Sequence, residues 1–395
     1  MEKVIYLDNN ATTCVAPEVF EAMRPYFCER YGNPSSIHSF GGSVAAEIEK
    51  ARCQVADLLG VGFRDKDGVA TEIIFTSCGT EGDNAAINAA LNMRPDRKKI
   101  ITTAVEHPGV LSYCKFLERQ GYEIVLLPVR SNGSLDLDDV RAAVDENTAV
   151  VSVMWANNET GTIFPVAEIA EIAHGAGALF HTDAVQAAGK VAIELDKTEI
   201  DFLSISGHKL HAPKGIGVLY VRRGLRFRPL IWGGHQERQR RAGTENVASI
   251  IGLGMAAELA KKNLDEEIVT LSALRDRLEK GLQERIPNIR INGDLENRLP
   301  NTASVSFEYI EGESILMLLD QFGICASSGS ACTTGSLEPS HVLRAMGIPY
   351  TAAHGTIRFS LSRYNSREDI DRVIEVLPPI IERLRQISPY WNTGE

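Results

Sequence analysis

The sequence predicts an α/β protein with a large, mostly parallel sheet and a second, smaller α+β domain. Between residues 71 and 220, short β-rich runs alternate with helical patterns. The β-rich runs are almost continuously apolar, which is typical of parallel strands that helices cover on both faces. After residue 243 this alternation gives way to long helical patterns and isolated strands. The chain of 395 residues has room for two to three domains, at about 150 residues each.

The elements of the large sheet are expected in a regular order. Runs such as EIIFT, KIITT and AVVSVM combine apolar and β-branched residues, as strands do. The expected strands cover residues 72–76, 99–103, 123–129, 149–154, 178–182, 202–206 and 217–221, and the expected helices cover residues 81–91, 108–119, 137–144 and 166–174. Ligands bind beyond the carboxyl ends of the strands in such sheets, so the residues that follow each strand are the first candidates for a site.

The remaining elements predict the smaller domain. Helices are expected at residues 245–261, 266–285, 313–321 and 367–385, and strands at residues 302–308 and 356–362. We expect residues 15–260 to form the large domain, and residues 1–14 together with residues 261–395 to form the smaller one.

The composition excludes several classes of protein. Lys and Arg number 41 and Asp and Glu number 52, and the resulting net charge of −11 disfavours nucleic acid as the main partner. A hydrophobic content of 44% is enough for a large core and excludes a disordered chain. The seven cysteines are an odd number, which excludes a fully paired disulfide framework, and none has zinc-type spacing. Without a signal sequence or a long apolar run, the chain is expected to be cytoplasmic.

Four predicted strands end near side chains that suggest chemistry. Lys209 follows His208 among small residues, which suits an amine that forms an imine. Thr80 lies where a helix begins, so its hydroxyl and the helix N–H groups could hold a phosphate. Asp183 could hold a protonated ring nitrogen, and His107 stands at the corner before a helix. Each also has a plain structural interpretation, as an exposed loop lysine or as the N-cap of a helix or turn.

Two further candidates lie in the second half of the chain. Arg358 alternates with apolar residues in its strand and so faces a polar cleft or solvent, where a guanidinium suits a carboxylate. All eleven residues from 326 to 336 are small, which predicts a mobile loop around Cys332. A thiol on such a loop is better explained as a nucleophile that must travel than as a structural cysteine. The other cysteines are expected to be structural, with Cys78 near the turn at Thr80.

Together these features are the parts of a pyridoxal-phosphate site that acts on an amino acid. The chain resembles the class V aminotransferases and, within them, the cysteine desulfurases of the nitrogen-fixation (NifS) type. The resemblance extends from about residue 5 to residue 391 and rests on YLDNNATT at 6–13, GNPSS at 32–36, WANNETG at 155–161, GHKLHAPKG at 207–215, GHQER at 234–238 and SSGSACT at 327–333. It implies fold type I of the pyridoxal-phosphate enzymes, with a seven-stranded large sheet.

The resemblance also implies a role for individual residues. Lys209 is the lysine that bonds to pyridoxal 5′-phosphate, Asp183 faces the ring nitrogen, and Gln186 faces the phenolic oxygen. His107 stacks on the ring and takes part in proton transfers. The other implied roles are phosphate binding by Thr80, Ser206, His208 and Thr244 of the partner subunit, binding of the substrate carboxylate by Asn158 and Arg358, and nucleophilic attack by Cys332.

The activity implied by the resemblance is conversion of L-cysteine to L-alanine. The sulfur is held as a persulfide on Cys332 and passes to an iron–sulfur cluster scaffold protein, for nitrogenase maturation, and the enzyme is a homodimer. Ser206 departs from the nitrogen-fixation type, which often has Cys there. Alternatives are a housekeeping desulfurase, a selenocysteine lyase or an aminotransferase of the same fold. A non-catalytic sulfur carrier or scaffold is disfavoured because no cysteines have ligand spacing. Neither nucleic acid nor a membrane is an expected partner.

Overall fold

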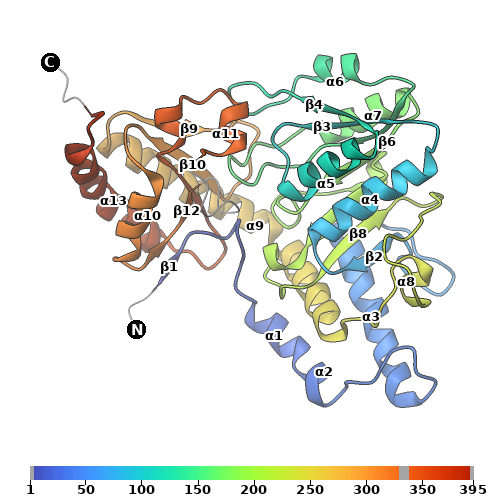
Figure 1. The fold of residues 1–395 in the computed structure, drawn as a ribbon. Helices are drawn as coiled ribbons and strands as arrows, with labels where there is room; N and C mark the ends of the chain where they lie inside the picture. Colours follow the sequence, from blue (N-terminus) through green and yellow to red (C-terminus); the bar gives the residue numbers. More distant parts are fainter. Residues whose placement is uncertain (1–3, 329–337, 392–395) are drawn as a thin grey trace.

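The computed structural model describes residues 4–328 and 338–391. The chain forms a large part built on a seven-stranded sheet and a smaller part built on a four-stranded sheet, and the long helix α9 (Val247–Arg285) extends from one to the other (Figure 1). Cys332 lies outside the described residues. No helix of the described chain has both the length and the apolar character needed to cross a bilayer.

The large sheet has the strand order β2-β8-β7-β6-β5-β3-β4. Its strands are β2 (Ile73–Thr76), β3 (Lys99–Thr103), β4 (Glu123–Leu127), β5 (Thr148–Ser152), β6 (Leu179–Asp183), β7 (Phe202–Ser206) and β8 (Gly217–Val221). Only β8 runs antiparallel to its neighbours, so the prediction of a mostly parallel sheet is confirmed. The predicted strands match the observed ones to within two residues at each end.

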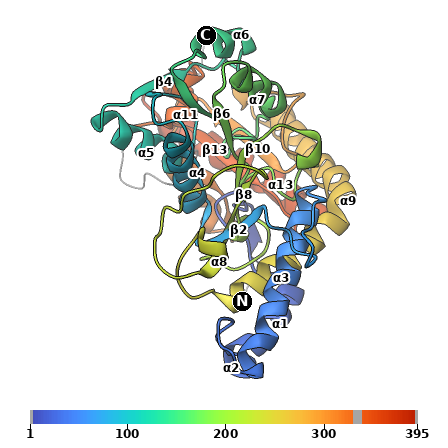
Figure 2. The same cartoon turned by 90° about the vertical axis from the view of Figure 1, so that its right-hand side faces the viewer.

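Helices cover both faces of this sheet (Figure 2). On one face, α4 (Gly79–Met93) and α5 (Pro108–Arg119) pack on Ile74, Ile100 and Val150. On the other face, the neighbouring strand residues Ile73, Ile101 and Val151 join a core with α3 (Ser39–Leu58), α7 (Val166–Gly175) and the first half of α9. Successive strand side chains point to opposite faces, so strands buried on both faces must be apolar throughout.

The smaller sheet has the order β12-β13-β10-β9 and a core of its own. Its strands are β9 (Ile289–Asn292), β10 (Thr302–Phe307), β12 (Ser327–Ser328) and β13 (Thr356–Ser360), and β1 (Ile5–Tyr6) pairs with β11 (Ile324–Cys325) beside it. The other helices are α1 (Pro17–Met23), α2 (Pro25–Cys28), α6 (Leu137–Ala143), α8 (Gln236–Gln239), α10 (Gly312–Asp320), α11 (His341–Ala345), α12 (Tyr350–Ala353) and α13 (Arg367–Ile387).

One predicted boundary between two helices is wrong. The two helices expected at residues 245–261 and 266–285 are the single helix α9. The residues between them include neither glycine nor proline, and the Asn263 side chain donates to the carbonyl of Leu259 one turn earlier, so nothing interrupts the backbone ladder. The helix α3 was not predicted at all, although it packs along α9.

Candidate active site

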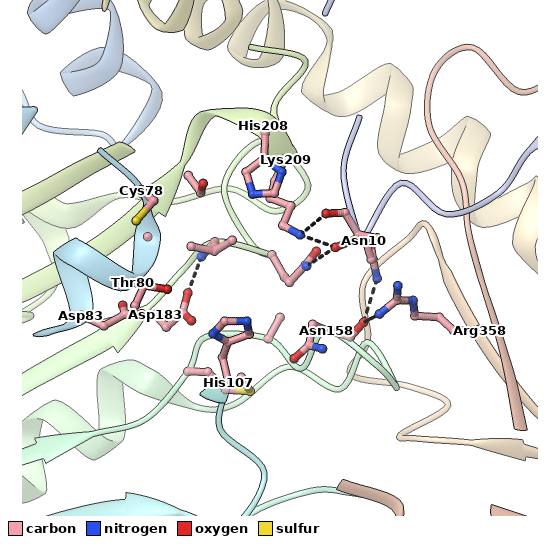
Figure 3. A pocket seen from close by; sticks show the side chains of 17 residues that line it. Asn10, Cys78, Thr80, Asp83, His107, Asn158, Asp183, His208, Lys209 and Arg358 are labelled. Carbon is pink, nitrogen blue, oxygen red and sulfur yellow. Dashed lines mark hydrogen bonds between the residues drawn. The ribbon is translucent and has the colours of Figure 1, made fainter. Parts of the chain in front are cut away.

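A cavity of about 370 Å³ opens at the carboxyl ends of the large-sheet strands (Figure 3). It is lined by nine of the residues singled out in the sequence, namely Thr80, His107, Asn158, Asp183, Gln186, Ser206, His208, Lys209 and Arg358. Cys78 also lines it, as expected from its place beside the turn. The cavity is therefore the site that the strand-end residues predicted.

Two predicted site residues do not line this cavity among the described residues. Thr244 lies in the exposed loop between α8 and α9 and is not part of the lining. The sequence resemblance assigned it to the cavity of the partner subunit, so its position here does not conflict with that prediction. Cys332 falls outside the described residues, and its role stays a prediction.

Lys209 is presented to the cavity by a tight turn that follows β7. Its Nζ donates to the carbonyl oxygen of Asn10 at 2.5 Å and to that of Ala11 at 2.7 Å. The N-terminal segment thus lies directly against the amine. The prediction of a reactive rather than an exposed loop lysine agrees with this position in the cavity.

Asn10 is the most connected residue that sequence reasoning missed. Its backbone N–H donates to Ser360 Oγ at 2.9 Å, and its side-chain amide donates to Thr302 Oγ1 at 2.9 Å. Both partners belong to strands of the smaller sheet, whereas Lys209 belongs to the large part. Asn10 therefore ties both parts of the molecule to the catalytic candidate. The YLDNNATT segment was noted only as a family motif, and its spacing alone gives no sign of these contacts.

The carboxyl groups of Asp183 and Asp83 are buried at one end of the cavity. Oδ1 of Asp183 accepts from the backbone N–H of Val185 at 2.9 Å. Burial, and then the neighbouring charge of Asp83, raise the pKa of Asp183 to about 7. Burial likewise raises the pKa of Asp83 to about 7. Within the described chain neither carboxyl has a Lys or Arg partner, so a cation that entered here would be stabilised.

His181 lies behind this end of the cavity but does not supply that cation. Its ring nitrogens contact Ser152 Oγ at 2.8 Å and Ser204 Oγ at 3.1 Å. Burial lowers the pKa of His181 to about 4, so the ring is neutral near pH 7. Because His181 is neutral, it does not compensate the negative charge of the two buried carboxyl groups, which remain able to bind a cation in the cavity.

The start of α4 forms an anion-binding corner of the cavity. Thr80 lies in the first turn of this 15-residue helix, whose free N–H groups favour a phosphate. A Cβ on Gly79 would lie 2.7 Å from Cγ2 of Val185, so glycine is needed for this close approach. Burial and the charge of Lys209 lower the pKa of His208 to about 4, and its Nδ1 contacts Thr12 Oγ1 at 3.1 Å.

His107 both caps a helix and lines the cavity, so its interpretation as a structural N-cap is compatible with its interpretation as a site residue. It is the N-cap of α5, and Pro108 occupies the first helical position as expected. Its Nδ1 accepts from the N–H of Gly109 at 3.0 Å. A neutral His107 therefore carries its proton on Nε2, which makes that atom a donor.

Arg358 is held at the opposite end of the cavity and is only 3% exposed. Nη2 pairs with Asp8 Oδ1 at 2.7 Å and Nη1 donates to the carbonyl of Asn158 at 3.0 Å. Its Nε has no acceptor among the residues that the structure describes. The surface interpretation of Arg358 is wrong, because β13 turns it inward, and the paired Asp8 was not predicted.

The chain matches known proteins over nearly its whole length. A sequence model described as "Aminotransferase class-V" matches residues 5–373. The chain is 60% identical over 388 residues to "Cysteine desulfurase NifS" of Azotobacter vinelandii, covering 98% of this chain and 95% of that protein. It is 55% identical over 393 residues to a cysteine desulfurase of Klebsiella pneumoniae, covering 100% and 96%. A solved structure titled "NIFS-LIKE PROTEIN" has a TM-score of 0.89 at 40% identity, covering 97% of this chain and 100% of that one. The NifS-like protein from Rickettsia africae ESF-5 has a TM-score of 0.85 at 33% identity, covering 96% and 100%.

Proposed function

The chain belongs to the aminotransferase class-V family, and we propose that it is a pyridoxal-phosphate-dependent cysteine desulfurase. The proposed reaction converts L-cysteine to L-alanine and leaves the sulfur as a persulfide on Cys332. The observation that carries this proposal is one cavity that contains an amine, a buried carboxyl group and a buried guanidinium, from Lys209, Asp183 and Arg358. The relatives from Azotobacter vinelandii and Klebsiella pneumoniae named above are both called cysteine desulfurases.

The charges of the cavity fit pyridoxal 5′-phosphate. The buried carboxyl of Asp183 lacks a Lys or Arg partner within the described chain, as expected of a group that holds a protonated ring nitrogen. The close approach at Gly79, with Thr80, Ser206 and His208, provides the corner for the phosphate. We assign Lys209 to the bond with the cofactor aldehyde and Gln186 to the phenolic oxygen. The cofactor, when bound, supplies an electron sink for the carbanion at the substrate Cα.

The residues of this chain bind the substrate and move its protons. Arg358 and Asn158 hold the carboxylate of L-cysteine, with Nε of Arg358 as the donor that has no acceptor within the described residues. The Lys209 amine is the general base that removes the Cα proton. His107 presents Nε2–H as a proton donor on the cavity wall.

The sulfur step needs a second thiol. The Cys332 thiolate attacks the substrate sulfur, so that an S–S bond forms and the Cβ–S bond breaks. Cβ then takes a proton, and the carbon skeleton leaves as L-alanine. The sum is enzyme thiol plus L-cysteine giving enzyme persulfide plus L-alanine, with no outside oxidant or reductant.

The partners belong to the same proposal. Thr244 is exposed and away from its own cavity, as a residue that serves the phosphate site of a partner subunit should be. Phe27, Tyr31, Ile37 and Trp232 each expose more than half of their surface, which suits a homodimer interface.

The persulfide acceptor is proposed to be an iron–sulfur scaffold protein that serves nitrogenase maturation, and the site of action is proposed to be the cytoplasm. We propose a division into residues 15–260 and residues 1–14 with 261–395, supported by the core of the smaller part, which among the described residues draws only on residues 5–7 and 271–381, although Leu299 and apolar residues between 342 and 353 pack in the core of the large part.

Two substitutions test the proposal. Cys332→Ala should keep the cofactor absorption but release no alanine from L-cysteine, because the substitution removes only the thiol that attacks the substrate sulfur. Lys209→Ala should stop exchange of the Cα proton with solvent, measured by NMR in D2O, as well as turnover. Normal alanine release by Cys332→Ala would contradict the nucleophile assignment. Products then separate the alternatives, since an aminotransferase forms a keto acid and a selenocysteine lyase prefers selenocysteine.

A further inference from the structure

Lys190 lies directly behind a residue of the cavity wall. It follows the turn after β6, and its Nζ donates to the side-chain Oε1 of Gln186 at 3.1 Å and to the backbone carbonyl of Gln186 at 3.2 Å. Lys190 does not line the cavity itself, whereas Gln186 does. The ammonium group therefore reaches the cavity only through Gln186.

These contacts determine which way the Gln186 amide points. Oε1 accepts from Lys190, and Nε2 donates to the carbonyl of Asn10 at 3.0 Å. The reversed amide would place its NH2 against an ammonium and its oxygen against a carbonyl, two repulsive contacts. An ammonium has only donors, so Lys190 imposes this choice in a way that a neutral donor–acceptor side chain does not.

The fixed amide leaves a donor for the cavity. Nε2 carries two N–H groups, of which the described chain uses one, on Asn10. The other is available to an acceptor inside the cavity. A donor backed by a positive charge forms a stronger hydrogen bond with an anionic oxygen than an isolated amide does.

We propose that Lys190 is a positioning residue that locks Gln186 as a hydrogen-bond donor to an anionic oxygen of the bound cofactor. The inference rests on the proposed function, because the oxygen in question is the phenolic oxygen of pyridoxal 5′-phosphate. Lys190 makes no contact with substrate or cofactor in this role, and acts through the Gln186 amide and through its charge.

The surroundings of Lys190 support a charge that is sensitive to an anion nearby. Burial, then the charges of Lys209 and Arg358, lower the pKa of Lys190 to about 7, and Glu267 on α9 acts in the opposite direction. An oxygen anion at Gln186 would favour the charged form. The cofactor and Lys190 thus stabilise one another's charged states.

The test measures cofactor binding and its absorption instead of turnover. Lys190→Met has similar length but neither charge nor donor, and Lys190→Arg keeps both. We expect Lys190→Met to raise the dissociation constant for pyridoxal 5′-phosphate about tenfold, corresponding to about 1.4 kcal/mol of lost binding free energy. The same change should shift the pH dependence of the bound-cofactor absorption. Lys190→Arg should stay within about twofold of wild type. Lys262→Met, on the exposed face of α9, is the matched control.

A double-mutant cycle separates positioning from a general effect on the fold. In a Gln186→Ala background, Lys190→Met should cause no further loss of binding, because the group it orients is gone. A full additional loss there, or wild-type binding and absorption in Lys190→Met alone, would overturn the proposal. If Lys190→Met does not fold, Lys190→Gln, which removes the charge but keeps a donor, should still raise the dissociation constant above that of Lys190→Arg. Failure of the proposed function is distinguishable, since the wild-type protein would then bind no cofactor.

Discussion

The two ends of the cavity carry opposite charges and are assembled in different ways. At one end lie the buried carboxyl groups of Asp183 and Asp83, and at the other lies Arg358, with Lys209 between them (Figure 3). The carboxylate end comes from one strand, β6, and one helix, α4, both of the large part. The cationic end joins the turn after β7, the N-terminal segment and β13 of the smaller sheet.

This difference explains how the site recognises a ligand that is positively charged on one side and negatively charged on the other. A ring that carries a proton at one side and an anionic oxygen at the other can lie in such a field in only one direction. The carboxylate end lies wholly within the large part, on β6 and on α4 packed against the sheet. The cationic end depends on contacts between the two parts of the molecule, so it is the end that should control the substrate.

Breaking the carboxylate end should have the larger effect. Asp183→Asn keeps the shape of the side chain and its acceptor for the Val185 N–H but removes the negative charge. We expect cofactor binding to weaken by at least about a hundredfold, since removal of one member of a buried charge pair costs about 3–5 kcal/mol. Equilibrium dialysis with absorbance detection measures this. The exposed Asp138→Asn is the control, and undiminished binding by Asp183→Asn would remove this residue from the ring site.

Breaking the cationic end should affect the substrate and spare the cofactor. Arg358→Gln removes the charge but keeps a donor, so we expect KM for L-cysteine to rise about tenfold or more, as loss of a charged hydrogen bond costs about 1.5–3 kcal/mol. Cofactor affinity should stay within about twofold. Steady-state kinetics measures KM for L-cysteine, and equilibrium dialysis measures the cofactor affinity. Arg277→Gln, in a surface pair with Asp371 on the smaller part, is the control. An equal loss of cofactor binding would mean that the two ends are not separate.

The same contrast marks what the sequence could predict. Asp183, His107, Thr80 and Lys209 lie at or just after the ends of strands of one sheet, and the carboxyl ends of parallel strands share one edge, so pattern alone brings them together. The cationic end needs contacts between residues about 350 positions apart, such as Asp8 with Arg358, and no local pattern encodes them. For that reason Asn10 and Asp8 were missed, and Arg358 could not be told from a surface arginine.

The smallest expected effect concerns the stability of the cofactor-free protein, in which the two ends should respond to pH in opposite directions. The pKa of Asp183 is about 7 in the folded chain against an ordinary 3.8. Between these values the folded chain holds a proton that the unfolded chain has lost, so stability falls as the pH rises. The pKa of Lys190 is about 7 against 10.5, so between these values the unfolded chain holds the extra proton and stability rises with pH.

These two groups therefore contribute least to stability near pH 7, where each is about half in its charged form and neither has its ligand. Thermal unfolding of the cofactor-free protein, followed by circular dichroism from pH 4.5 to pH 9.5, measures the profile. Asp183→Asn should make its acid side less steep, with Asp83 still titrating there, and Lys190→Met should flatten its alkaline side. A single change that flattened both sides would show that the carboxylate and cationic ends titrate as one unit. Added pyridoxal 5′-phosphate should stabilise the wild type most near neutral pH, because there the two groups lower the stability most and the bound cofactor compensates the charge of each.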